Sequence, residues 1–186
     1  MRRWPLSLAG LTARPLASGL TLAGLCILIL LALASATGLR VNTSRSIPLG
    51  LYRVSAGAVG LGAYVMFCPP PSALFLEARR RGYLAPGPCP GGYGYLMKRV
   101  SAVARDVVTL ADDGMRVNGE PLPHSAPRHA DPAGRLLPRY PLARYTLAPA
   151  ELLLMADGSD SSFDARYFGP IDQAQIRAVI QPVWTW

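Results

Sequence analysis

The feature that most constrains the fold of this chain is a long apolar stretch close to its N-terminus. Residues 15–39 carry no charge, and residues 20–33 are almost entirely Leu, Ile, Ala and Gly. An apolar run of roughly 20 residues is long enough to span a bilayer as one helix. Arginines precede the run, and positive residues favour the cytoplasmic side of a membrane. We therefore expect one N-terminal transmembrane helix, with the chain after Arg40 exported.

The sequence predicts two parts on this basis. Residues 1–39 form a cytoplasmic N-terminus and membrane anchor, and residues 40–186 form an exported domain. A second interpretation stays open, because Ala34-Ser35-Ala36 has the small residues of a signal-peptide cleavage site. In that case the segment is a signal peptide that is removed, and the domain is exported without an anchor.

Net charge raises the question of a nucleic-acid partner. The formal net charge is +8, but the only tight basic cluster is at residues 79–81, and no aromatic residues interleave with a basic stripe. A nucleic-acid platform needs that combination, so we expect no nucleic-acid partner. A basic exported domain is attracted instead to the anionic headgroups of membrane lipid.

The cysteines indicate a disulfide rather than a metal site. Cys68 and Cys89 both fall in the expected exported part, where an oxidising compartment favours pairing. Two buried thiols are the alternative. Cys26 lies within the apolar stretch. The spacing and the neighbours of the three cysteines do not suggest a metal site.

Short apolar runs separated by turn residues predict a mainly β fold for the exported domain. Residues 63–68 are typical of a buried strand, and the prolines at 69–71 end it. Turn signals at 112–114 and 118–119 flank residues 115–117, as in β-hairpins. We expect a barrel-like coil of short strands, with further strands at 51–54, 95–104, 107–110, 152–156 and 176–184, a helix at 72–81, a loop at 82–94, and a proline-rich surface insertion at 121–149.

Lys98 is the only lysine in the chain, against eighteen arginines. Arginine keeps its proton because its pKa stays above about 12, whereas lysine can lose its proton when burial destabilises the ammonium form. Apolar neighbours at 95–97 and at Val100 predict such burial. Lowering the pKa from about 10.4 to near 8 takes roughly 3 kcal/mol. Lys98 is therefore a candidate general base; the alternative is a surface lysine at a strand edge.

A hydroxyl-rich segment just after the apolar stretch supplies a candidate nucleophile. Pro48 and Gly50 fix and turn the backbone behind it. A hydroxyl held on a rigid turn next to a bilayer can meet a membrane-tethered substrate. A plain Ser/Thr-rich linker is the alternative. The hydroxyl residues are Thr43, Ser44 and Ser46.

A polar segment at 157–169 is the third candidate. On a strand, Asp164 and Arg166 point to the same face and can form an ion pair that braces a site. Ser162 is on that face too and can orient an amine. The alternative is a polar turn with one surface ion pair, which contributes little.

These three segments, in this order, carry a family resemblance. Residues 42–52 follow the pattern Asn-x-Thr/Ser-x-Ser-x-Pro-x-Gly-x-Tyr, with Ser46 at the nucleophile position. Met97-Lys98-Arg99-Val100 looks like a lysine box, and residues 162–169 look like the last box of the same family. The chain thus resembles the type I signal peptidase family of Ser–Lys proteases, and most closely its conjugative-transfer branch, the TraF peptidases.

The resemblance implies a mechanism and a site. Ser46 attacks the scissile carbonyl while neutral Lys98 takes its proton, and no cofactor or metal is required. The Ser46 N–H and the Ser44 hydroxyl hold the oxyanion. Ser162 contacts Lys98, while Asp164 and Arg166 support the wall of the site.

The resemblance also implies a substrate and a location. The substrate is the conjugative pilin precursor or another exported pre-protein, and the product is linear or cyclic. The partners are inner-membrane lipid and the type IV conjugation machinery, with the catalytic domain in the periplasm. A general signal peptidase and a non-catalytic assembly component are the alternatives. His124 and His129 lie in the proline-rich insertion without a motif, so we assign them no catalytic role.

Two positions depart from the family pattern. The Gly-Asp pair that follows the lysine box reads Arg105-Asp106 here, so a turn usually made by glycine has to form without it. The Gly-Asp-Asn that precedes the last box reads Ala156-Asp157-Gly158.

Overall fold

The computed structural model describes residues 13–186. The chain divides into two units between Leu39 and Arg40, and the first holds one helix, α1 (Ala13–Ala36). Among the residues described, no helix is long and apolar enough to cross a membrane. The predicted transmembrane helix is therefore not confirmed, and residues 1–12 of the predicted cytoplasmic N-terminus lie outside the described part of the chain.

The second unit is mainly β, as the sequence predicts. The predicted strands and the predicted helix are all present, with ends that differ by a few residues. The elements are β1 (Leu39–Asn42), β2 (Gly50–Ser55), β3 (Tyr64–Phe67), α2 (Ala73–Arg80), β4 (Leu96–Ala102), β5 (Val107–Ala111), β6 (Gly114–Val117), β7 (Glu120–Pro121), β8 (Tyr145–Thr146), β9 (Glu151–Met155), α3 (Ala165–Phe168), β10 (Ile171–Asp172), η2 (Gln173–Gln175) and β11 (Ile176–Thr185).

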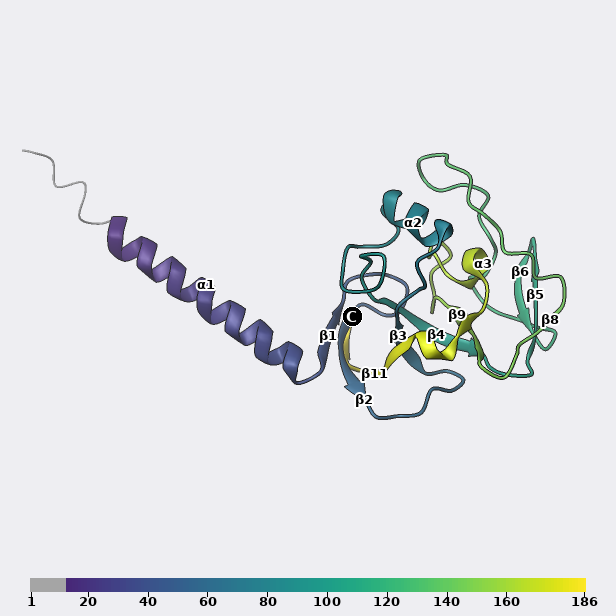
Figure 1. The fold of residues 1–186 in the computed structure, drawn as a ribbon, viewed down its shortest axis with the longest axis horizontal. Helices are drawn as coiled ribbons and strands as arrows, with labels where there is room; N and C mark the ends of the chain where they lie inside the picture. The colour runs from purple at the N-terminus through teal and green to yellow at the C-terminus, as the bar shows by residue number, and fades with distance from the viewer. Residues whose placement is uncertain (1–12) are drawn as a thin grey trace, which may run out of the picture. The chain divides into compact units, whose positions relative to one another are not determined.

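The strands form two antiparallel sheets (Figure 1). The larger has the order β1-β2-β11-β3-β4-β9-β10, and the smaller has the order β7-β6-β5-β8. The late strand β11 lies between the early strands β2 and β3 and pairs with both. A closed, barrel-like coil stays a prediction.

Strand β4 presents one apolar face to the core, and that face also carries Lys98. Side chains alternate between the two faces of a strand. Leu96, Val100 and Ala102 are therefore on the same side as Lys98, and all four residues are buried. Partners on both edges, β3 and β9, keep water away from the backbone. The pattern of β4 thus places its one cationic core residue in apolar surroundings.

Cys68 and Cys89 form a disulfide that joins the end of β3 to the loop before β4. Both residues are buried in the main apolar core. Between them, Ser72 caps α2 by accepting a hydrogen bond from the N–H of Phe75 (3.5 Å). The disulfide closes the segment that contains α2, and Phe75 and Ala78 pack the helix into the same core.

The turn after β4 forms although glycine is missing there. Arg105 takes a left-handed backbone conformation with φ 75°. The Asp106 carboxylate accepts hydrogen bonds from the N–H of Val103 (2.8 Å) and the amide of Asn118 (2.8 Å). These bonds hold the turn in a shape that is strained for a residue with a Cβ.

The segment between β7 and β8 is less exposed than the sequence predicts. Ser125, Asp131 and Leu142 are buried within it. Asp131 accepts hydrogen bonds from Tyr83 (2.5 Å) and from the guanidinium of Arg135 (2.7 Å). Prolines and polar residues concealed this burial, and the Tyr83 partner of Asp131 lies far away in the sequence.

Candidate active site

A cleft of about 610 Å³ brings together residues from all three predicted segments. The loop after β1 contributes Ser44 and Ser46, strand β4 contributes Lys98, and the loop before α3 contributes Ser162. Asp164 and Arg166 do not line this cleft but lie fully buried behind it. The cleft lining also includes Arg45 and Asp131 as charged residues from different loops.

Three polar atoms form a closed triangle in the cleft. Lys98 Nζ lies 2.6 Å from Ser46 Oγ and 2.6 Å from Ser162 Oγ. The two hydroxyl oxygens lie 2.9 Å apart. Every pair is at hydrogen-bond distance, so a proton on Ser46 has a direct path to the amine.

Burial gives Lys98 the protonation behaviour that the sequence predicts. The residue is 3% exposed. Desolvation lowers the pKa of its amine to about 8; Asp164 opposes this shift, and Arg166 adds to it. A base with this pKa is partly neutral near pH 8, so it can accept a proton from a hydroxyl.

The loop that carries Ser46 is clamped by one buried side chain, Asn42. Its amide donates to the carbonyls of Ser44 (2.8 Å), Ile47 (3.0 Å) and Pro48 (3.0 Å). Its oxygen accepts from the N–H of Ser44 (3.1 Å). A single asparagine therefore fixes the backbone on both sides of the candidate nucleophile.

The other fixed positions of the motif anchor the same loop. The Tyr52 hydroxyl donates to the Pro48 carbonyl (2.7 Å). Gly50 has φ 151°, and a Cβ there would lie 2.2 Å from the carbonyl oxygen of Trp184 in β11. Only glycine allows this close approach between the loop and β11. The pattern Asn-Pro-Gly-Tyr is thus a set of backbone restraints around Ser46.

The two predicted oxyanion donors both belong to residues that line the cleft, but within the described part of the chain one is free and the other already donates a hydrogen bond. The Ser46 N–H has no hydrogen-bond acceptor among residues 13–186. The Ser44 hydroxyl donates to Asn42 Oδ1 (2.9 Å). Ser44 is exposed, so its hydroxyl can rotate toward a substrate oxygen only by leaving Asn42.

The prediction that Asp164 and Arg166 lie on a strand is wrong. Asp164 is the N-cap of α3, and Arg166 belongs to the first turn of that helix. The two side chains still pair, with Arg166 Nε 2.7 Å from Asp164 Oδ1 and Nη2 2.8 Å from Oδ2. An Asp two residues before an Arg fits a cap as well as a strand, and the short helix has no periodicity to reveal it.

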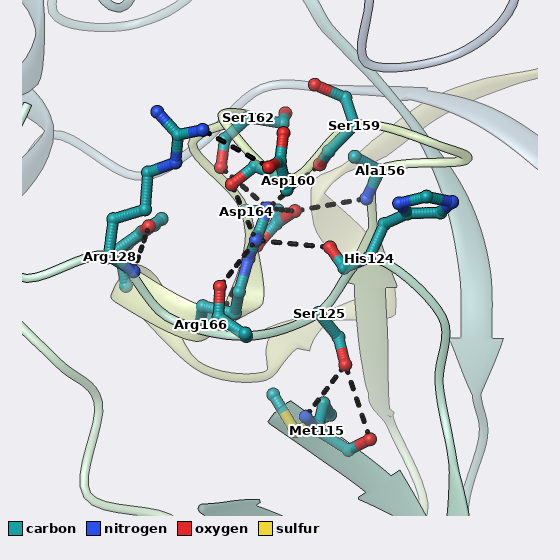
Figure 2. A network of polar contacts seen from close by, with 12 residues as sticks. Met115, His124, Ser125, Arg128, Ala156, Ser159, Asp160, Ser162, Asp164 and Arg166 are labelled. Atoms are coloured by element: carbon teal, nitrogen blue, oxygen red, sulfur yellow. Dashed lines mark hydrogen bonds and ion pairs between the residues drawn. The ribbon is translucent and has the colours of Figure 1, made fainter. Parts of the chain in front are cut away.

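Arg166 is the centre of a buried hydrogen-bond network (Figure 2). Both it and Asp164 are 0% exposed, so the alternative of a surface ion pair is also wrong. The guanidinium donates to backbone carbonyls of two separate loops, the one between β7 and β8 and the one between β9 and α3, and so ties them together behind the cleft. Besides Asp164, its acceptors are the carbonyl oxygens of His124 (3.2 Å), Ala126 (3.1 Å), Ser159 (3.1 Å), Asp160 (2.9 Å) and Ser162 (3.0 Å).

Asp157 was given no definite role from the sequence, but it connects to the Ser46 loop. Its N–H donates to the Ser46 carbonyl (2.7 Å). Its carboxylate accepts a short hydrogen bond from Tyr64 and pairs with Arg99 (3.2 Å). Burial and the contact with Asp157 raise the pKa of Tyr64 to about 12. Its place just before the last box was the only sequence signal for this role.

The described residues contain no cluster of metal-ligating side chains. No group of three or more His, Cys, Asp or Glu side chains there could hold an ion. His124 reaches the network through its backbone carbonyl, and neither His124 nor His129 lines the cleft.

Comparison with known proteins agrees with the sequence resemblance. The chain matches a family model described as signal peptidase, peptidase S26, over residues 14–186. It is 57% identical over 171 residues to a plasmid transfer protein TraF of Escherichia coli, covering 92% of this chain and 96% of the relative. It is 36% identical over 169 residues to a conjugal transfer protein TraF of Agrobacterium tumefaciens (strain 15955), covering 90% and 94%.

A solved structure shows a weaker likeness. The crystal structure of a signal peptidase I from Enterococcus faecalis V583 matches with a TM-score of 0.38 and 17% identity, covering 68% of this chain and 100% of that chain. Family membership rests on the family model and on the relatives, not on this structure. The chain belongs to the peptidase S26 family of signal peptidases.

Proposed function

We propose that this protein is a serine endopeptidase in which Ser46 is the nucleophile and Lys98 the general base. The triangle of Ser46, Lys98 and Ser162 carries the proposal. It joins a hydroxyl on a clamped loop to a buried amine of lowered pKa, within a cleft large enough for a peptide. Membership of the S26 family supports the same chemistry.

In the first half of the reaction, Ser46 Oγ bonds to the scissile carbonyl carbon while its proton passes to neutral Lys98 Nζ. The carbonyl oxygen becomes an oxyanion, which the Ser46 N–H and the rotated Ser44 hydroxyl stabilise. Lys98 then gives the proton to the leaving amine as the C–N bond breaks, which leaves an acyl-enzyme.

In the second half, water or an amine attacks the ester carbonyl and gives its proton to Lys98. Collapse of the second tetrahedral intermediate returns the proton to Ser46 Oγ. Ser162 holds the Lys98 amine in place through both halves (2.6 Å). Asp164 and Arg166 act behind the cleft as positioning residues, through the Ser162 carbonyl and the neighbouring loops.

The substrate and the location are part of the proposal. The similar proteins are named for plasmid and conjugal transfer, which supports an exported precursor of the conjugation system, above all the pilin precursor. The Cys68–Cys89 disulfide supports a domain that works in an oxidising compartment, the periplasm. The N-terminal segment would bring it to the inner membrane or be removed on export.

Mass spectrometry of a conjugative pilin precursor, co-expressed with this protein, tests the proposal. We expect a shortened pilin with the wild type and an intact precursor with Lys98→Arg, which keeps the charge but not a titratable amine. Arg177→Lys, at an exposed position of β11, is the matched control and should process normally. A mass lower by one further water would identify a cyclic product.

Processing by a folded Lys98→Arg variant would rule out the Ser–Lys mechanism. A precursor left intact by the wild type, with other exported precursors cut, would indicate a general signal peptidase. If no exported precursor were cut, a non-catalytic assembly role would replace the protease.

A further inference from the structure

Beside the active-site cleft lies a second hollow of about 360 Å³, the apolar groove. Tyr83, Leu137 and Phe163 line both hollows, so the groove adjoins the cleft. Phe163 follows Ser162, whose hydroxyl contacts both Lys98 and Ser46. One face of α2 and the segment 136–138 form the remaining walls. The groove therefore begins next to the proposed reacting atoms.

Hydrogen bonds hold the two walls of the groove together. The Arg81 guanidinium at the end of α2 donates to the Leu136 carbonyl (2.7 Å). The Arg135 guanidinium donates back to the Arg81 carbonyl (3.3 Å). The shared residue Tyr83 is fixed to Asp131 (2.5 Å). Because its walls are linked, the groove is already formed in the free protein, and little binding free energy is lost in ordering it.

The lining selects for an uncharged, apolar occupant. Its only charged residues, Glu77 and Arg81, pair with each other (2.6 Å) and leave no free charge for a ligand. The rest of the lining is aliphatic, aromatic or proline. Leu136 is 77% exposed at the groove, an apolar surface that gains by being covered.

We propose that the apolar groove binds an apolar side chain of the substrate, a few residues from the scissile bond. This inference rests on the proposed peptidase function. An extended peptide advances about 3.3 Å per residue, so only a side chain near the scissile bond reaches a groove that adjoins the cleft. The groove then selects precursors by sequence beyond the residues at the bond itself.

Cleavage of peptides that span the pilin cut site is the first test. Each position within four residues of the bond is made Leu or Gln in turn. We expect the wild type to prefer Leu at one position by about tenfold in kcat/KM, and Leu136→Gln or Leu74→Gln to reduce this preference below about threefold. Leu76→Gln, an exposed position of α2 outside the groove, is the control and keeps the preference. A peptide truncated before that position should be cut equally by all four proteins.

Cross-linking tests the groove without catalysis. A full-length Ser46→Ala protein is irradiated with the same peptide carrying photo-leucine at each position, and the adducts are mapped by mass spectrometry. We expect adducts in residues 74–81 and 136–138, and their loss in Leu136→Gln. Cleavage without adducts or groove dependence would overturn the inference and leave the peptidase standing. Adducts without cleavage by the wild type would keep the groove as a peptide site and remove the peptidase.

Discussion

Lys98 and Arg166 are both buried cations, and the fold treats them in opposite ways. Lys98 contacts two hydroxyls and no carboxylate, and its pKa falls to about 8. Arg166 is paired with Asp164 and surrounded by carbonyl oxygens, and its pKa is raised although burial alone would lower it. One cation is left easy to deprotonate, and the other is saturated with acceptors.

The difference shows how two buried cations in one domain can serve different ends, one as a reactive group and one as a rigid support. A buried charge without a counter-ion is costly, and the cost falls when the group gives up its proton. A buried cation with a full set of acceptors keeps its proton, and its hydrogen bonds restrain the loops that provide those acceptors. Substituting each cation by the same apolar residue separates the two roles.

The largest expected effect is on activity, in Lys98→Met. Methionine has a similar length and suits the apolar face of β4, but it has no base. We expect kcat/KM to fall by at least about 10⁴-fold while the free energy of unfolding stays equal or rises. Peptide cleavage and urea unfolding measure the two quantities. A stability loss comparable to the activity loss would mean that Lys98 is a structural residue.

Arg166→Met should do the reverse. It leaves Asp164 as an unpaired buried charge, so we expect the free energy of unfolding to fall by about 3–5 kcal/mol. Thermal and urea unfolding measure this. The double variant Asp164→Asn/Arg166→Met should lose less than the sum of the two single losses, because the pair is removed together. Strict additivity would show that the pair does not act as a unit.

The pH dependence of activity should follow the Lys98 amine. In the proposed mechanism the neutral amine is the active form, and its fraction rises with pH until the pKa of about 8 is passed. We expect kcat/KM to level off above that pKa and to approach a tenfold fall per unit well below it, which gives a fall of roughly 50-fold from pH 8 to pH 6. Initial rates across this range check the sign. A profile that stays flat from pH 6 to pH 9 would exclude Lys98 as the titrating base.

Ser162→Ala should have a smaller effect on rate. It removes one of the two hydroxyls that hold the Lys98 amine (2.6 Å) and leaves the other in place. We expect a loss of about tenfold in kcat, with little change in KM. Ser161→Ala is the control, because Ser161 also lines the cleft but, among residues 13–186, its hydroxyl hydrogen-bonds only to Ser159 (3.4 Å). Equal losses in the two variants would contradict a positioning role for Ser162.

The smallest effect concerns a residue outside both clusters, Arg105. Its left-handed conformation is strained, and glycine would relieve that strain. We expect Arg105→Gly to raise the free energy of unfolding by about 0.5–1 kcal/mol without changing activity. Chemical denaturation measures this change, against which the stability changes of the Lys98 and Arg166 variants can be compared. A destabilised Arg105→Gly protein would show that the arginine side chain contributes more than its backbone strain costs.

Sequence reasoning predicted the strands and the segments of the site because their signals are local. Alternation in β4 and the turn residues around β6 can be identified within a few positions. The solitary Lys98 and the 42–52 pattern pointed to the cleft that now contains them. These features depend on residue type and spacing, which a sequence shows directly.

What sequence reasoning missed depends on partners far away in the chain. The acceptors of Arg166 come from loops about 40 residues apart, at Ala126 and at Ser162. The 42–52 pattern marks Asn42 but does not reveal its three backbone acceptors. The groove between α2 and residues 136–138 has no sequence signature either, since its walls meet only in the folded domain.

The placement of β11 has a consequence for when this protein can act. Residues 176–185 are synthesised after every other strand described, yet they lie between β2, which follows the Ser46 loop, and β3, which flanks the Lys98 strand. A nascent chain that lacks them has a gap between the halves of its site. Under the proposed function, proteolytic competence would therefore wait until this late strand has been made and has paired with both neighbours.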